Sequence, residues 1–445
     1  DLEHTLPGSL QVLRLAAAMP PDTIPWPWLE ELTKRTNPEV FEPTPQFLKG
    51  RWTRIRRTLE GRDLITEGRH PGTTGRMHRL IADHIKTHNP PETDLVDEFI
   101  THRARKLGAD FTQAPELWEI DSITDALPDI LTRKLELLKH VANFVCLVAL
   151  RYVTDTRIAV MLQDLNQQVS GTHNRTSFIV HTLLGDTLRN TDPAQARESY
   201  QRSLAIARHL VEIWPEDLQA RQDLTVALNN VAGVLKYGDP GQALKIYEES
   251  LDIRRELAAE LSGDFQARRG LGIALNNVAG VLKYSDPGQA LKIYEESLDI
   301  SQELAAELSG DFQACRDLAI NLIDIAGVLK CSDPGQTLKV YEESLGISRE
   351  LAAQLPGNLQ ALWDLGVAAA RLAQLLPTKD PERIPLWREA AISFRDALAI
   401  QPEHRELGRM SYQAALDYAD CDPDDRDEWL AYAAELAERF GFGKQ

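Results

Sequence analysis

The chain has 445 residues, of which 43% are hydrophobic and 26% charged, and its formal net charge is −18. The length predicts two to four domains, or one long repeat array with a globular part, and the hydrophobic content excludes wholesale disorder. Residues 1–90 hold 13 Lys/Arg and 11 Asp/Glu, a balance of +2, so the remaining residues carry −20. That acidity disfavours nucleic acid as their partner, because phosphates would be repelled.

The bulk sequence also argues against a membrane or disulfide-bonded protein. Its longest uncharged apolar run, Phe144 to Leu150, is far shorter than the ~20 residues needed to span a bilayer. No secretory signal peptide is expected from the sequence given, and four scattered cysteines are too few for a disulfide framework or a zinc site. We therefore expect a cytoplasmic protein without a membrane segment. Because the chain begins with Asp1 and not Met, the sequence is also compatible with a fragment of a longer protein.

The first 90 residues have the element order of a winged helix, so the sequence predicts a winged-helix domain over 1–90. Three helices are expected before a β-hairpin, and a closing helix after it. The expected helices are Ser9–Met19, Trp28–Arg35, Pro45–Leu59 and His78–Thr87, and the expected strands are Asp63–Thr66 and Gly75–Met77.

The third of these helices admits two interpretations. It is basic, as a recognition helix in a DNA major groove would be, with Lys49, Arg51, Arg54, Arg56 and Arg57. However, Trp52, Ile55 and Leu59 lie on the same helix, and the near-neutral charge of residues 1–90 argues against strong DNA binding.

Residues 76–85, RMHRLIADHI, resemble the end of the winged-helix domain in signal-transducing NTPases of the NB-ARC type, the NLR-like STAND class. In that family a strand ending in Met-His precedes an Arg-Leu-Val-type helix. The resemblance implies that His78 contacts the phosphates of a bound nucleotide and holds the inactive state. Arg79 stands where the family has Asp, which puts this latch in doubt, and the alternative for His78 is a packed or surface histidine.

No G-x-x-x-x-G-K-[ST] phosphate loop occurs anywhere in the sequence. We therefore expect no cofactor in this chain. The resemblance implies instead that a nucleotide domain binding ATP or ADP precedes Asp1 in a longer parent. Residues 91–174 contain helical segments separated by proline-containing breaks, which predicts a helical linker.

The second half of the chain is a repeat. Residues 239–285 and 286–332 align without gaps and differ at ten of 47 positions. An Asp-Pro pair recurs every 47 residues, beginning at Asp192, Asp239, Asp286, Asp333 and Asp380. A fixed period of this length predicts a stacked array in which each unit buries its apolar face on the next.

Each repeat predicts two antiparallel helices. Asp239 caps a helix that starts at Pro240 and extends to about Leu261, and Ser262-Gly263-Asp264 ends it and caps a second helix over Phe265–Tyr284. Glycines recur in the second helix as Gly233, Gly280 and Gly327. Since glycine lowers helix propensity, their recurrence predicts close backbone approach between neighbouring helices.

The unit resembles a tetratricopeptide repeat. The small, aromatic and small residues of that family's second helix are Ala243, Tyr247 and Ser250 here, and they recur as Ala290, Tyr294 and Ser297. The period of 47 exceeds the usual 34. The resemblance implies a mainly α fold in which residues 175–402 form a right-handed α-solenoid of five long helical hairpins. Residues 403–445 are expected to be C-terminal capping helices.

In tetratricopeptide arrays the first helix of each pair lines a concave groove, so the polar residues of those helices are candidate partner-binding residues. Lysines repeat every 47 residues, with asparagines two turns earlier. The candidates are Lys236, Lys283, Lys330, Asn229, Asn230, Asn276 and Asn277. A protein or peptide ligand is expected there. The alternative is that duplicated units copied one solvated lysine.

The sequence has no metal-binding H-E-x-x-H, no G-x-S-x-G serine elbow and no evident catalytic carboxylate pair, so no enzyme activity is expected of this chain. Three functions stay open. The leading hypothesis is the sensor portion of a bacterial NLR-like STAND protein, whose winged helix couples to a nucleotide switch and which can oligomerise on activation. The others are a stand-alone scaffold and a transcription regulator whose winged helix binds DNA.

Overall fold

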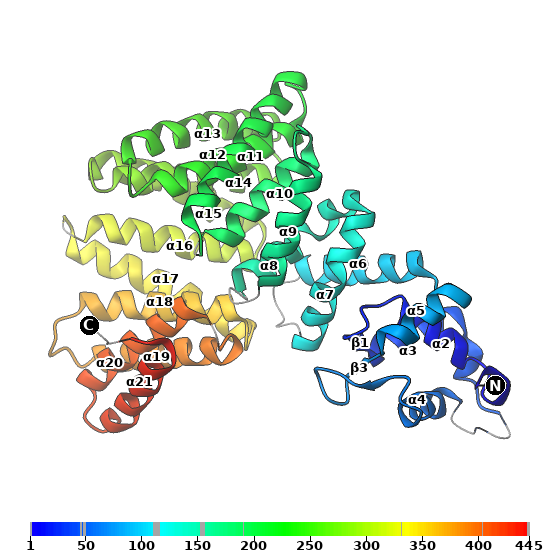
Figure 1. Cartoon of the computed structure of the whole chain (residues 1–445). Coiled ribbons are helices and arrows are strands. Elements are labelled where there is room, and N and C mark those ends of the chain that lie inside the picture. The colour runs from blue at the N-terminus through cyan, green and yellow to red at the C-terminus, as the bar shows by residue number, and fades with distance from the viewer. Residues whose placement is uncertain are drawn as a thin grey trace. The chain divides into compact units, whose positions relative to one another are not determined.

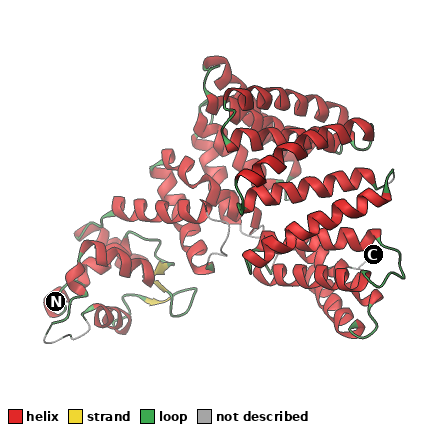
Figure 2. Ribbon diagram, turned by 180° about the vertical axis from the view of Figure 1, so that it is seen from behind, coloured by secondary structure: helices red, strands yellow, loops and turns green. Residues whose placement is uncertain are grey.

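A computed structural model describes residues 2–44, 47, 50–109, 116–151, 156–189, 191–330, 332–402 and 404–442. It has two compact units, the first made mainly of residues 1–111, 115–148 and 155–168, and the second mainly of residues 169–445, with residues 149–151 at the end of a helix of the first unit counted in the second. Both are mainly α-helical, and the three strands in the described residues are all in the first unit (Figure 2). The expected mainly α fold is confirmed.

The first unit begins with helices arranged around a small sheet. Its short helices and strands are α1 (Leu2–Thr5), α2 (Ser9–Ala17), β1 (Ile24–Pro25), α3 (Trp26–Thr36), η1 (Pro38–Val40), α4 (Trp52–Gly61), β2 (Thr66–Glu67), β3 (Thr74–Arg76) and α5 (Arg79–His88). The sheet is antiparallel with strand order β1-β3-β2. A hairpin is present, but its first strand is Thr66–Glu67 and not the expected Asp63–Thr66. Strand β1 was not predicted, since its two residues are too few to form a sequence pattern.

The expected start of the third helix was wrong. Helix α4 begins at Trp52, and of the preceding residues Thr44 and Phe47 pair in an isolated bridge. Gly50 lies between them and the helix with a φ of 76°, and an added Cβ there would lie 2.6 Å from the carbonyl oxygen of Phe41. The chain turns tightly at this glycine, so the helix forms only after it.

Longer helices complete the first unit. They are α6 (Thr93–Ala109), α7 (Leu117–Arg133), η2 (Leu135–Leu137), α8 (Leu138–Arg151) and α9 (Thr156–Gln168). The indole of Trp28 on α3 packs edge-on against Phe99 of α6 and Trp118 of α7, with ring centroids 5.9 and 6.1 Å apart. Since Trp28 is only 1% exposed, this aromatic cluster joins the N-terminal helices to the segment predicted as a linker.

The second unit is a tetratricopeptide-like array of helical hairpins (Figure 1). We call the first helix of each hairpin an A helix and the second a B helix. The A helices are α10 (Arg175–Leu188), α12 (Leu218–Leu235), α14 (Phe265–Leu282), α16 (Phe312–Leu329) and α18 (Leu359–Leu375). The B helices are α11 (Pro193–Ile213), α13 (Pro240–Glu260), α15 (Pro287–Glu307), α17 (Pro334–Gln354) and α19 (Arg383–Ile400). Helices α20 (Arg405–Cys421) and α21 (Arg426–Phe440) follow as a terminal pair.

The Asp-Pro signal sets the start of four B helices as expected. The carboxylates of Asp192, Asp239, Asp286 and Asp333 each accept a hydrogen bond from the backbone N–H three residues on, at 2.9–3.0 Å. Proline follows at the first helical position, where no N–H is needed. The fifth pair behaves differently: the last B helix begins only at Arg383, so the prediction that Asp380 starts a helix was wrong.

The recurring glycines do not bring backbones together as expected. A Cβ added at Gly280 would meet the Nζ of Lys236 at 3.1 Å and the hydroxyl of Tyr294 at 3.5 Å, and at Gly327 it would meet nothing within 4 Å. In the first hairpin the equivalent position is Asp186, which accepts a hydrogen bond from Tyr200 at 2.7 Å. Glycine at this position therefore leaves room for side chains.

Candidate ligand-binding groove

A groove with a volume of about 370 Å³ lies between the A helices α14 and α16, with side chains of the B helix α15 between them. Each of the three helices exposes one polar stripe to it, and the end of α12 contributes a lysine. The polar lining consists of Lys236, Arg269, Asn276, Asn277, Lys283, Tyr294, Ser297, Ser301, Arg316, Asp317, Asn321 and Asp324. A volume of this size is typical of a site for a small ligand or for a few side chains of a peptide.

Two of the three predicted lysines line the groove. Lys236 and Lys283 follow the last residues of α12 and α14, and both are half-buried. Within the described residues neither amine has a hydrogen bond or ion pair, although Lys283 lies 5.0 Å from the ring centroid of Tyr284. Burial, and then the nearby charge of Lys283, lowers the pKa of Lys236. The third lysine, Lys330, is exposed and is not among the residues that line the groove.

The predicted asparagines divide in the same way. Asn276 and Asn277 line the groove, whereas Asn229 and Asn230 hold the equivalent places on α12, outside it. The side-chain oxygens of Asn229 and Asn276 are buried and accept no hydrogen bond within the part of the chain that the structure describes. A buried acceptor without a donor costs about 1–3 kcal/mol, so an N–H group from a ligand would be stabilised there.

Asp324 is a groove residue that sequence reasoning missed. It stands on α16 where the preceding unit has Asn277. Burial raises the pKa of Asp324, while the charges of Lys283, Lys236 and Arg371 oppose that rise. Because Asn277 and Asp324 are one of the ten differences between two otherwise matching units, comparing the copies could have singled the position out.

A hydrogen-bonded cluster of small polar side chains forms part of the groove. The Asn321 amide donates to the hydroxyls of Ser297 at 2.9 Å and Ser301 at 3.1 Å, and Ser297 donates to the carbonyl of Gly272 at 3.0 Å. Asn321 is only 1% exposed, and its side-chain oxygen lacks a donor among the described residues. This part of the groove therefore offers a further acceptor.

Ion pairs join successive A helices, and we call them the inter-unit ladder. Arg175 pairs with Asp223 at 3.0 Å, Arg269 with Asp317 at 2.5 Å, and Arg316 with Asp364 at 2.5 Å. In each pair the aspartate lies 48 residues after the arginine. The pairs occupy Arg269 and Arg316, so the two lysines remain as the cations of the groove without a partner in the described structure.

The differences between the two matching units concentrate at this groove. Of the ten positions, six have at least one copy among the lining residues. These pairs are Arg254/Ser301, Gly270/Asp317, Gly272/Ala319, Ala274/Asn321, Asn276/Ile323 and Asn277/Asp324. Most of the repeat sequence is thus unchanged, whereas the side chains that line the groove differ from one unit to the next.

His78, the candidate nucleotide contact, lies in the other unit. It is exposed and forms the N-cap of α5, where its Nδ1 accepts a hydrogen bond from the backbone N–H of Leu80 at 3.3 Å. Arg79 is also exposed and lies 3.7 Å from Asp22. In this chain His78 has a local role in capping α5, and its predicted contact with a nucleotide stays a prediction.

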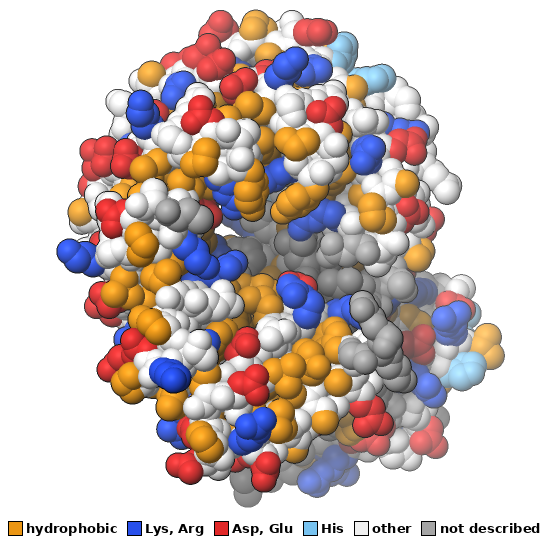
Figure 3. Space-filling view, turned by 90° about the vertical axis from the view of Figure 1, so that its left-hand side faces the viewer, with side chains coloured by type: hydrophobic (Ala, Val, Ile, Leu, Met, Phe, Trp, Pro, Cys, Tyr) orange, Lys and Arg blue, Asp and Glu red, His pale blue; other side chains and the backbone are white. Residues whose placement is uncertain are grey.

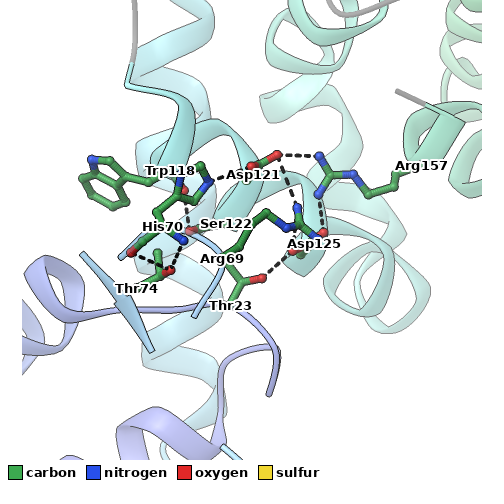
Figure 4. Close-up of polar contacts among 9 residues, drawn as sticks. All are labelled: Thr23, Arg69, His70, Thr74, Trp118, Asp121, Ser122, Asp125 and Arg157. Atoms are coloured by element: carbon green, nitrogen blue, oxygen red, sulfur yellow. Dashed lines mark hydrogen bonds and ion pairs between the residues drawn. The ribbon is translucent and has the colours of Figure 1, made fainter. Parts of the chain in front are cut away.

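The first unit also contains a charged cluster that the sequence did not predict (Figure 4). Asp121 and Asp125 of α7 both pair with Arg157 of α9, and Asp121 accepts from the ring nitrogen of His70 at 2.8 Å. Burial pushes the pKa of Asp121 upward, but the hydrogen bonds from Arg157 and His70 outweigh it, so the pKa lies below its usual value. Since His70 lies between β2 and β3, the cluster ties the hairpin to α7 and α9.

The net charge of −18 is not gathered into one acidic surface on the face seen in Figure 3, where basic and hydrophobic side chains are interspersed with acidic ones. Among the described residues no helix is long and apolar enough to cross a membrane. The same residues contain no group of three or more His, Cys, Asp or Glu side chains placed to hold a metal ion.

Comparison with known proteins finds structural similarity only. No family model and no curated protein sequence matches the chain. A Rap protein in complex with competence and sporulation factor is 14% identical, with a TM-score of 0.43 over 78% of this chain and 92% of that chain. Human IFIT1 bound to m7Gppp-AAAA is 10% identical, with a TM-score of 0.41 over 78% and 73%.

BtubC from P. vanneervenii is 19% identical, with a TM-score of 0.36 over 56% of this chain and 92% of that chain. Similarity this low does not indicate which ligand the present chain binds. The groove itself is therefore the observation that indicates a function.

Proposed function

We propose that the array binds an extended peptide segment of a protein partner, and that the groove between α14 and α16 is part of that binding site. The observation that carries the proposal is the unmet polar chemistry of the groove. Lys236 and Lys283 have no partner in the described structure, and the oxygen of Asn276 has no donor. A peptide supplies both missing groups, since its carboxylates pair with amines and its backbone N–H groups donate to amide oxygens.

The experiment is a selection of random twelve-residue peptides displayed on phage against the full chain. Selected peptides are then synthesised, and their affinities are measured by fluorescence anisotropy. Charge reversal of the lysine row, K236E/K283E/K330E, is expected to weaken binding at least tenfold, because reversing a charge beside a carboxylate changes attraction into repulsion.

The array offers a matched control. Lys245, Lys292 and Lys339 also repeat every 47 residues, but they are exposed on the B helices α13, α15 and α17. K245E/K292E/K339E makes the same change in net charge away from the groove and should leave binding within about twofold. Equal effects of the two triple variants, or peptides that bind the first one unchanged, would refute the proposed site.

We further propose that residues 1–90 are a winged-helix domain and that the chain is the sensor portion of an NLR-like STAND protein. The support is the antiparallel sheet with β1 between α2 and α3, and the position of His78 directly before α5. Ligand binding would then act by favouring one arrangement of array and winged helix over another. In a longer gene product with a phosphate loop before Asp1, His78→Ala should reduce the amount of ADP that copurifies.

Two alternatives have distinct outcomes in the same experiments. A scaffold would retain peptide binding, while its full-length gene would encode no phosphate loop. A transcription regulator would show DNA binding by the full chain that weakens steeply with salt. Charge reversal of the exposed Arg54 and Arg57 on α4 would abolish that binding.

A further inference from the structure

One rung of the inter-unit ladder is missing, between α12 and α14. The 48-residue spacing places Gln222 opposite Gly270, so both the cation and the carboxylate of that rung are absent. Each of the other three successive pairs of A helices from α10 to α18 has its rung. The ladder is therefore interrupted at a single interface of the array.

Another arginine, from α13, occupies the place of the missing carboxylate. A Cβ added at Gly270 would lie 2.6 Å from the Nη1 of Arg254 and 3.1 Å from its Cζ. The guanidinium thus packs directly on α14 in space that only glycine leaves open. In the next unit the corresponding residues are Ser301 and Asp317, and there the smaller serine leaves the groove open.

The guanidinium of Arg254 has no hydrogen bond or ion pair within the described residues. Burial lowers its pKa, and no neighbouring carboxylate counteracts that effect. Other arginines of the same interfaces are paired: Arg221 with Glu256 and Glu260, and Arg268 with Glu303 and Glu307. Partial burial of a charge without a counter-charge is unfavourable, so an anion reaching Arg254 would be stabilised.

The position of Arg254 belongs to the same surface as the groove. Its copy, Ser301, lines the groove between α14 and α16, so Arg254 lies at the corresponding place between α12 and α14. Two cations from neighbouring helices therefore pack on glycines of α14: Arg254 on Gly270 and Lys236 on Gly280. At 1.5 Å per residue these contacts are about 15 Å apart along the helix axis. Asn276 and Asn277 lie between them in sequence.

We propose that Arg254 binds a carboxylate of the peptide and that the array thereby selects an acidic segment, with a second carboxylate on Lys236. This inference rests on the proposed peptide-binding function. An extended peptide rises about 3.3 Å per residue, so a separation of about 15 Å corresponds to acidic residues four or five positions apart. The segment would lie along α14, and the amides between the two cations would contact its backbone.

The net charge of the chain does not oppose this choice of ligand. Glu256 and Glu260 are paired with Arg221, and Asp317 with Arg269. More distant carboxylates are screened, since the Debye length is about 8 Å at physiological ionic strength. Arg254 and Lys236 are therefore the local cations that an incoming acidic segment meets, and Asp324, which lies near Lys236, is the carboxylate that opposes it.

The test uses the phage-selected peptides and the full chain. Peptides that compete for the groove should be enriched in Asp or Glu four or five positions apart. R254S introduces the residue that the next unit has naturally. It should lower the affinity for these peptides about tenfold or more, as expected for loss of a hydrogen bond between charged groups. The control is R255S, on the same helix, which removes an exposed arginine paired with Glu296 at 3.3 Å and should have no effect.

A double-mutant cycle between Arg254 and the peptide distinguishes direct binding by Arg254 from an indirect structural effect of R254S. Replacing one peptide glutamate by glutamine should weaken binding to the unmodified chain, but not further weaken binding to R254S. If R254S leaves affinity unchanged while K236E/K283E/K330E abolishes binding, the role of Arg254 is wrong and the groove proposal survives. If the groove triple variant binds normally, or no peptide is enriched, the proposed function fails and this inference with it.

Discussion

The partly buried rung between Arg316 and Asp364 allows a sharp test of what holds successive units together. The two side chains are 22% and 13% exposed, with a 2.5 Å contact, and Gln360 also donates to Asp364 at 2.9 Å. R316A leaves the partly buried carboxylate of Asp364 without its cation. Because such a loss removes a charged hydrogen bond and leaves a charge unpaired, we expect it to destabilise the array by about 2–3 kcal/mol.

The control for R316A is R349A. Arg349 also joins neighbouring hairpins, through Glu389 at 2.7 Å, but it is 53% exposed. Solvent screens this pair, so its loss should cost less than about 1 kcal/mol. At roughly 2–4 °C per kcal/mol for a unit of this size, R316A should lower the melting temperature by about 4–12 °C and R349A by only a few degrees.

Asp364 adds a pH signature to this experiment. Burial raises its pKa, and the charge and hydrogen bond of Arg316 oppose that rise, so removing Arg316 raises the pKa further. Protonation in mild acid then removes the unpaired charge, and the defect of R316A should shrink as the pH falls from 7 towards 5. Thermal melting, with hydrogen exchange in α16 and α18, measures both effects. Equal losses for R316A and R349A, or a pH-independent defect, would show that the Arg316–Asp364 pair is no better shielded from solvent than the Arg349–Glu389 pair.

Three further predictions concern other charged groups. Burial raises the pKa of Asp186 and Asp324, so the stability they contribute is complete below about pH 4 and is lost as the pH rises through their folded-state pKa. Protection factors of the array amides, corrected for the pH dependence of the intrinsic exchange rate, should therefore rise between pH 7 and pH 5, and lower protection at pH 5 would contradict this. The pKa of Asp121 is lowered, so the stability that Asp121 contributes is present above about pH 4 and is lost in stronger acid. Proteolysis in acid should then cut the β2–β3 hairpin before the array. If the hairpin is no more sensitive than the array, this prediction is wrong. D324N introduces the residue that the preceding unit has at Asn277, and it removes the carboxylate beside Lys236. The affinity for acidic peptides, measured by fluorescence anisotropy, should therefore rise several-fold. Weaker binding would show that Asp324 contacts the ligand.

The local signals in the sequence predicted most of the array. Asp239 and its copies cap B helices at the expected residues because a cap and the following proline act within one turn. Asp264 starts the next A helix for the same reason. The signal failed at Asp380, where the B helix starts at Arg383, and at Trp52, where the turn at Gly50 delays the helix. In both places chain geometry around the turn outweighed the expected pattern.

The choice of groove residues depended on the tertiary structure. Three lysines share one position in the repeat, yet Lys236 and Lys283 line the groove and Lys330 does not, because the neighbouring helices determine what surrounds each copy. Asp324 and Arg254 acquire their significance only from residues on other helices that pack beside them. A period of 47 residues determines helices and their caps locally, whereas burial and pairing of a charge depend on side chains that a neighbouring unit supplies.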